Sequence, residues 1–111
     1  MTDYSVLSDR EIDRLVLNVV YGIHANDKDI QGCWSRGGFK YTSNASDAWS
    51  IITENKISTM WMAAEKEWCA WANGELEEEC WEWKYYPDDY YNHQNPLRAA
   101  MIVFLQMQEN K

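Results

Sequence analysis

The chain has 111 residues, 46% hydrophobic and 25% charged, which predicts one globular domain over residues 1–111 and excludes a disordered, collagen-like or coiled-coil chain. The net charge of −8 repels the phosphate backbone and so disfavours nonspecific binding to nucleic acids. The sequence has no apolar run long enough for a membrane span, no signal-peptide pattern at its start, and only three widely spaced cysteines, so we expect a cytoplasmic protein.

A capping box marks the first predicted helix. Ser8 can accept a hydrogen bond from the first turn, and Glu11 stands three residues later, where its side chain can reach back to the cap. Apolar residues then recur at helical spacing as far as Val20, and Gly22 provides a natural end. We therefore predict a helix between Ser8 and Gly22 with one buried face.

The next part of the chain is predicted as a loop followed by a helix. Residues 24–41 are polar and contain several glycines, which indicates a long loop with at most one short strand. Asn44 is a favourable cap for a second helix, and Asn55 tolerates the left-handed conformation that ends one. Trp49 belongs to the apolar stripe of this helix, and we expect it in the core.

Short runs rich in Trp and Tyr then replace the helical spacing, which predicts antiparallel strands. Their approximate limits are 57–63, 66–72 and 77–85.

The register of the last two predicted strands stays open. Asn73-Gly74 is the strongest turn signal between them. A two-residue turn there would place Cys69 opposite Glu78, whereas a four-residue loop would pair Trp68 with Trp81.

The final predicted helix begins at Asn95-Pro96, a cap residue followed by proline, after a loop over residues 87–94. This helix is apolar over most of its circumference, so we expect it to be the most buried element. Arg98 lies in its first turn, where it can reach solvent or pair with Asp88 or Asp89. The predicted fold is α+β: an antiparallel meander of three or four strands covered by two or three helices.

Acidic and aromatic residues are concentrated over residues 65–89, where nine acids and two lysines give a net charge of −7. The seven Trp of the chain exceed what so small a core can hide, so some must reach the surface. Exposed Trp and Tyr among carboxylates are typical of an interface for a protein with a basic surface. The candidate partner-binding residues are Trp68, Trp71, Glu77, Glu78, Glu79, Trp81, Trp83, Asp88, Asp89, Tyr90 and Tyr91.

Two other interpretations of the aromatic residues stay open. The rings could simply be covered by helices or by a second copy of the chain in a homodimer. They could also hold a small nucleotide-like molecule, for which Arg36 and Lys40 are the nearest candidate cations.

Residues able to bind a metal or act as nucleophiles are few and scattered. No close Cys or His pair at metal-ligand spacing occurs, and no local signature of a catalytic nucleophile surrounds any cysteine. The residues considered are Cys33, Cys69, Cys80, His24 and His93. We therefore predict no catalytic residue, no metal site and no cofactor, and a protein that is not an enzyme.

Three blocks of the sequence, Tyr4–Ile12, Asn44–Ser58 and Asn95–Glu109, resemble the NinX-like proteins of lambdoid phages and prophages. The resemblance implies a phage accessory protein without an assigned activity, and a fold similar to the phage ABA sandwich domain, in which helices cover an antiparallel sheet. Ser50 stands where the family usually has proline, and residues 59–86 match none of its blocks closely. The resulting hypothesis is a module that binds a host or phage protein in the cytoplasm of the infected or lysogenic host, to blunt a defence or redirect an enzyme.

Overall fold

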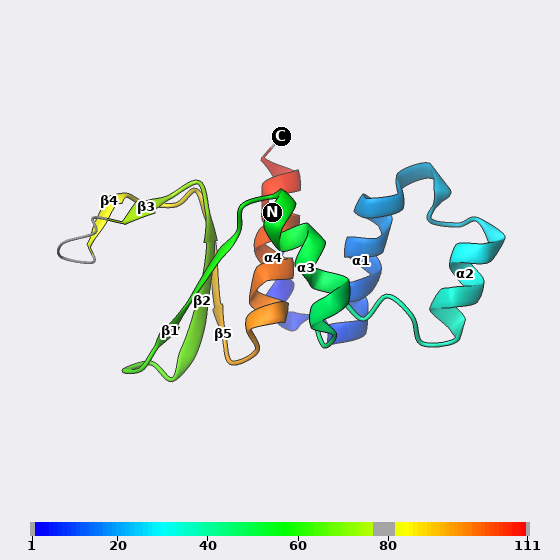
Figure 1. Cartoon of the computed structure of the whole chain (residues 1–111), viewed down its shortest axis with the longest axis horizontal. Coiled ribbons are helices and arrows are strands. Elements are labelled where there is room, and N and C mark those ends of the chain that lie inside the picture. Colours follow the sequence, from blue (N-terminus) through cyan, green and yellow to red (C-terminus); the bar gives the residue numbers. More distant parts are fainter. Residues whose placement is uncertain (1, 77–81, 111) are drawn as a thin grey trace.

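The computed structural model describes residues 2–76 and 82–110, which form a sheet on one side of helix α4 and further helices on its other side (Figure 1). The molecule is elongated, with principal extents of 50 × 28 × 25 Å. The α+β fold class is confirmed. The elements in chain order are η1 (Tyr4–Val6), α1 (Asp9–Tyr21), η2 (Gly22–His24), α2 (Lys28–Ser35), α3 (Ala45–Glu54), β1 (Ser58–Met62), β2 (Glu67–Ala72), β3 (Glu75–Leu76), β4 (Trp83–Tyr85), β5 (Asp89–His93) and α4 (Pro96–Glu109).

Side-chain caps start the three helices that the sequence predicts. At α1, the backbone N–H of Glu11 donates to Ser8 Oγ and the N–H of Ser8 donates to Glu11 Oε1, both at 3.1 Å. Asn44 caps α3 through its side-chain oxygen, and Asn95 caps α4 directly before Pro96. Because each cap satisfies amide groups that the helix itself leaves unpaired, these starts depend only on local sequence. All three predictions are confirmed.

Helix α2 lies in the segment predicted as a loop, so that prediction was wrong. The helix has only eight residues, contains Gly32, and receives no side-chain hydrogen bond from its cap residue Asp27. Tertiary contacts hold it instead: the Arg10 guanidinium lies 3.4 Å from the centroid of the Trp34 ring and donates to the carbonyl oxygens of Trp34 and Gly38. These contacts come from α1, and the sequence of α2 alone does not reveal them.

Strand β2 is the centre of a three-stranded antiparallel sheet with the order β1-β2-β5. Cys69 pairs with Met60 on β1 and with Asn92 on β5. Strand β5 was predicted as a loop, and that prediction was wrong. Of the third strand predicted over residues 77–85, residues 83–85 form β4, which pairs with β3 and not with β2, and residues 77–81 lie outside the described part of the chain. The two predicted registers named Glu78 and Trp81, which also lie outside it, and β1 and β5 occupy the two sides of β2.

The chain between β2 and β5 leaves this sheet at Asn73, which has a positive φ of 62°. It forms the separate two-stranded sheet β3-β4 and returns at Pro87. A Cβ on Gly74 would lie only 2.9 Å from the nitrogen and Cβ of Pro87, so the outgoing and returning chains are in close contact there. Asn73-Gly74 therefore turns the chain out of the sheet and does not join two of its strands in a hairpin.

Helix α4 forms the middle of the core, and its residues 98–105 are all buried. It packs against β2 and β5 on one side and against α1 and α3 on the other. The prediction that it is the most buried helix is confirmed. The prediction for Trp49 was wrong: α3 turns Ala48 and Ile51 to the core, and the Trp49 side chain is 64% exposed.

Arg98 is buried in the first turn of α4, so the expectation that it reaches solvent or pairs with Asp88 or Asp89 was wrong. It donates to Asp9 Oδ1 at 2.8 Å and to the carbonyl oxygens of Leu7 and Tyr4 at 2.7 and 3.1 Å. The segment before α1 lies against the start of α4, and its carbonyls and Asp9 accept hydrogen bonds from the two terminal nitrogens of the guanidinium. Its Nε has no hydrogen-bond partner among the described residues.

Candidate binding face of the sheet

The two faces of the three-stranded sheet differ in what covers them. Side chains alternate along β2, so Ala70 and Ala72 point to α4 while Cys69 and Trp71 point the other way. All the helices lie on the α4 side in Figure 1. We call the opposite side the outer face; its strand residues are Ser58, Met60, Met62, Glu67, Cys69, Trp71, Tyr90 and Asn92.

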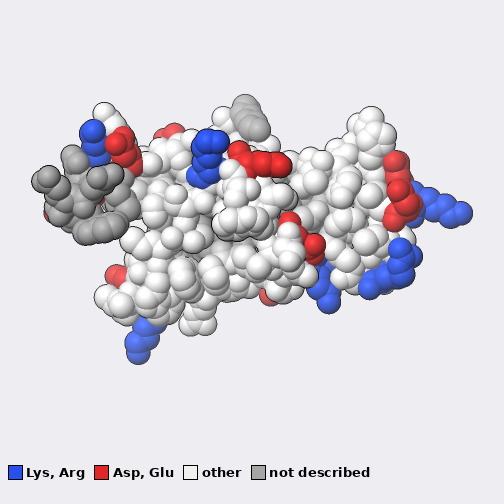
Figure 2. All heavy atoms as spheres, viewed as in Figure 1, with Lys and Arg blue, Asp and Glu red and all other residues white. Residues whose placement is uncertain are grey.

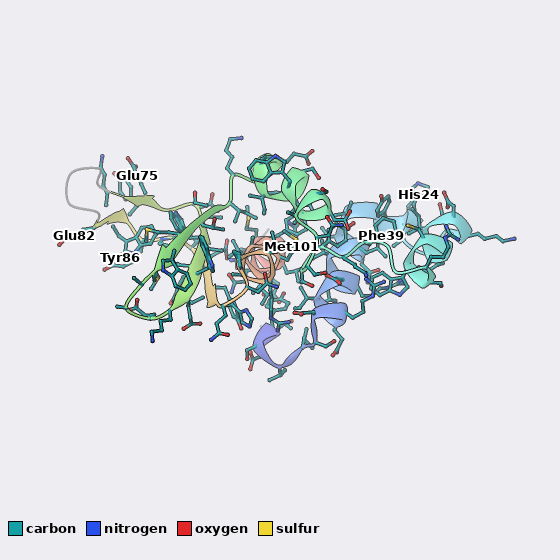
Figure 3. All side chains as sticks on the ribbon, turned by 60° about the horizontal axis from the view of Figure 1, so that its bottom comes forward. His24, Phe39, Glu75, Glu82, Tyr86 and Met101 are labelled. Carbon is teal, nitrogen blue, oxygen red and sulfur yellow. The ribbon has the colours of Figure 1, made fainter. Side chains whose placement is uncertain are left out.

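The outer face contains a hollow of about 430 Å³ beside the returning chain of β4. Trp83 packs edge-on against Trp71, with ring centroids 5.2 Å apart, and Tyr86 lies next to Trp83 at 6.3 Å. Figure 3 shows Tyr86 at the sheet end of the molecule. The hollow is lined by Met60, Met62, Cys69, Trp83, Tyr86, Pro87, Tyr90 and Asn92.

The chemistry of the hollow is apolar, with thioethers, aromatic rings and one amide. None of its described lining residues carries a formal charge at neutral pH. Burial raises the pKa of the Cys69 thiol, so the sulfur is protonated at neutral pH and is a poor nucleophile. The site is suited to an uncharged or apolar group, held by ring and thioether contacts.

The structure divides the predicted partner-binding residues between the two faces. Trp71, Trp83 and Tyr90 lie on the outer face or over it. Trp68 and Tyr91 lie on the α4 side, where Trp68 packs on Trp61 at 5.5 Å and Tyr91 packs against the core. The predicted residues therefore do not form one surface.

The two predicted acidic residues that the structure describes, Asp88 and Asp89, differ in exposure. Asp88 is exposed, whereas Asp89 is only 4% exposed and accepts a hydrogen bond of 2.6 Å from Asn110 Nδ2. Burial raises the pKa of Asp89. The remaining predicted residues, Glu77, Glu78, Glu79 and Trp81, lie outside the described part of the chain.

A sequence model of the family described as Bacteriophage P22, NinX matches residues 3–108. The chain belongs to this family. No curated protein and no solved structure matches it. The resemblance carried by the three sequence blocks is thus confirmed, and the matched span includes residues 59–86, which provide most residues of the outer face and of the lining of its hollow.

In this NinX family member, the two candidate cations for a nucleotide-like ligand lie far from the hollow. Arg36 ends α2, which lies at the end of the molecule opposite the sheet (Figure 1). Lys40 lies between α2 and α3, and its backbone N–H donates to Asp47 Oδ2 on α3 at 3.0 Å. Both are exposed, and the neighbouring Gly37 takes a positive φ of 86° where α2 ends. The structure therefore does not bring these cations together with the aromatic cluster.

Charges on the visible face of the molecule are dispersed. Figure 2 shows Asp and Glu in several small groups, with Lys or Arg near most of them and a broad uncharged surface between. Glu75 pairs with Lys84 at 3.8 Å in the β3-β4 region. The acidic character of the sequence therefore does not produce one continuous patch on the described part of this face.

Five lining residues, Met60, Met62, Tyr86, Pro87 and Asn92, were not among the sequence candidates. Met60 and Met62 are two positions apart in a predicted strand and so share a face, which is a signal that the sequence does contain. Met is a weak strand former, so the composition of this segment gives only a weak signal for a strand. Asn92 stood in a predicted loop and had no such signal.

The described residues offer no group of three His, Cys, Asp or Glu side chains that could hold a metal ion. Among the helices over residues 2–76 and 82–110, none is long and apolar enough to cross a membrane.

Proposed function

We propose that this phage accessory protein is a non-enzymatic binding module, and that the hollow on its outer face receives an apolar or aromatic side chain of a partner protein. One observation carries the proposal: a group of methionine and aromatic side chains surrounds an open hollow on the outer face of the sheet, which the helices do not cover. Buried anchors of this type provide most of the binding energy of a protein interface.

The side chains around the hollow suit protein recognition. Tyr86 and Tyr90 are 80% and 59% exposed and stand at its rim, where they can bury area on a partner and still hydrogen-bond through their hydroxyls. Met60 and Met62 can adapt to the shape of an inserted group, because thioether side chains are flexible and polarisable. An exposed apolar surface of this kind is a recognised mark of an interaction site.

The charge of the chain supports a partner with a basic rim around its apolar anchor. The net charge is −8, Glu67 lies on the outer face, and Figure 3 shows Glu82 at the same end of the molecule as Tyr86. A basic partner would be steered to this end of the molecule, with an association rate that falls as salt rises. We place this interaction in the cytoplasm of the infected or lysogenic host.

Photo-crosslinking from the rim of the hollow tests the proposal. A benzoylphenylalanine at position 86 or 90 should capture the same protein from a lysate of infected cells, and Met60→Asp should abolish both crosslinks. The matched control places the crosslinker at Trp49, an exposed aromatic position on α3. Capture that is equally strong from position 49, or unaffected by Met60→Asp, would overturn the proposal.

The acidic contribution is tested separately. Reversing the charges of Glu77, Glu78 and Glu79 to Lys should slow capture by the same crosslinking positions and flatten its salt dependence. Unchanged capture would remove these three residues from the interface and leave the apolar anchor in place.

A small uncharged aromatic molecule is the second candidate occupant. The volume of about 430 Å³ lies within the range of ligand pockets, roughly 300–1,000 Å³. A ligand stacked beside Trp83 should quench tryptophan fluorescence, and because the described lining has no cation, a nucleoside should do so at least as well as its phosphate. Fluorescence that responds to neither would exclude this candidate.

A further inference from the structure

Strand β1 forms one edge of the three-stranded sheet. Over the described part of the chain it pairs only with β2, so its other side offers free backbone groups. Its five residues, Ser-Thr-Met-Trp-Met over 58–62, include no charged residue and no proline. Natural sheets protect their edges with such residues or with bulges, and an unprotected edge is a template for pairing with another strand.

The opposite edge of the same sheet differs from β1 in these respects. Strand β5 follows Pro87 and Asp88 directly, and its first residue is the buried Asp89, tied to Asn110 on the last turn of α4. A proline and two carboxylates at this end disfavour the addition of another strand. Only β1 therefore has the sequence of a pairing edge.

We propose that β1 pairs in antiparallel orientation with β1 of a second copy of the chain, which joins the two three-stranded sheets into one sheet of six strands. A two-fold axis at Met60 makes this pairing self-complementary. Met60 then faces Met60 of the other copy, Thr59 faces Trp61, and Ser58 faces Met62. Each pair shares a face of the sheet, because Thr59 and Trp61 lie on the α4 side and the other three residues lie on the outer face.

Charge and packing are compatible with this register. No charged residue meets a like charge across the axis. Lys56, before one strand, lies toward the turn after the other, where Glu65 and Lys66 carry opposite charges and leave no net repulsion. Trp61 is 48% exposed and would cover Thr59 of the second copy, gaining buried area on association.

Dimerisation in this way would place both hollows on one continuous surface. Met60 and Met62 line the hollow of each copy, so the two hollows would approach each other across the axis. This inference goes beyond the proposed function and does not depend on it. Because a pair of five-residue strands buries less than a standard stable interface, we expect a dissociation constant on the order of 10 to 100 μM.

Sedimentation velocity on the full chain over a concentration series tests the proposal. The wild type should shift from monomer toward dimer as its concentration rises. Met60→Lys and Met60→Glu should each weaken self-association by about tenfold or more, since like charges then meet at the axis. An equimolar mixture of the two variants should restore the dimer, because the opposite charges now face each other.

The control is Tyr90→Lys, which adds the same charge to the outer face at the other edge strand and should leave the dimer intact. Circular dichroism verifies that each variant is folded, and the restored dimer of the mixture verifies it independently. A wild type that stays monomeric at every concentration would overturn the proposal. So would a dimer that Met60→Lys does not weaken, or a mixture that stays monomeric.

Discussion

Over residues 69–72, where β2 packs on α4, the two faces of the strand differ: alanines face the helix, and Cys69 and the large indole of Trp71 face away from it. Ala70 and Ala72 meet α4 and are almost completely buried, at 0% and 2% exposure, while Cys69 and Trp71 point to the outer face. Small side chains let the helix approach the strand closely, and close packing of this kind leaves little room for larger groups. The face that packs on α4 and the proposed binding face are therefore opposite sides of one strand, and substitutions on each side can test this division.

The largest loss of stability should come from Arg98, on the helix side. Arg98→Ala leaves the carbonyls of Tyr4 and Leu7 and the carboxylate of Asp9 without their donor, and we expect the free energy of unfolding to fall by about 3 kcal/mol. Urea denaturation measures this. Asp9→Asn is the matched control; because Asp9 is exposed, its loss should stay below about 1 kcal/mol. Equal losses would mean that the ion pair, and not the buried carbonyl contacts, provides the stability.

A direct test of the two faces adds or removes volume on each. Ala70→Leu forces a larger side chain between β2 and α4 and should destabilise by about 2 kcal/mol. Tyr90→Ala removes a much larger side chain from the outer face, yet it should change stability by less than about 0.5 kcal/mol, because Tyr90 is largely exposed. Thermal unfolding followed by circular dichroism compares them. A Tyr90 variant as unstable as Ala70→Leu would contradict the division.

The same division explains how much of the fold the sequence could predict. The starts of α1, α3 and α4 depend on caps a few residues long, so Ser8, Asn44 and Asn95 were sufficient to locate them. The partner of β2 depends on a strand about twenty residues away, and local spacing has no information on it. The turn at Asn73-Gly74 was a true turn signal, but the same signal fits a hairpin and an exit from the sheet.

The sequence could predict which strand residues share a face of the sheet, but not which of the two faces α4 covers. Trp68 and Trp71 are an odd number of positions apart in one strand, so their side chains must point to opposite faces. The sequence does not say which of them α4 covers. That choice follows from Ala70, which shares a face with Trp68 and gives α4 room to pack. Once α4 is placed, Trp71 is assigned to the outer face, and Tyr90 follows as its partner on β5.

A smaller effect is expected where the β3-β4 segment leaves and rejoins the sheet. Gly74→Ala places a methyl group 2.9 Å from Pro87 and should separate the two chains at a cost of about 1 kcal/mol. The edge-on contact of Trp71 and Trp83 should weaken with it, which lowers the near-ultraviolet circular dichroism of the coupled indoles. Gly22→Ala is no substitute as a control because its φ is positive. Gly32→Ala in α2 serves instead, because the nearest atoms to its new methyl group belong to the flexible side chain of Arg36. If Gly74→Ala leaves the tryptophan signal at its wild-type level, the hollow does not depend on this contact.

The smallest effect, and one that depends on pH, is expected at Asp89, the carboxylate on the helix side of β5. Because burial raises its pKa in the folded state, the folded protein binds this proton more tightly than the unfolded chain does, and Asp89 destabilises the fold at neutral pH. As the pH falls from neutral toward the ordinary aspartate value of 3.8, this penalty should disappear. Asp89→Asn keeps an oxygen to accept from Asn110, so at pH 7 its melting temperature should equal the wild-type value or exceed it by about 2 °C. In acid, near the ordinary aspartate pKa, the wild type should lose that disadvantage. If the advantage of the variant instead grows on acidification, the fold stabilises the buried carboxylate as the anion, and the prediction for Asp89 is wrong.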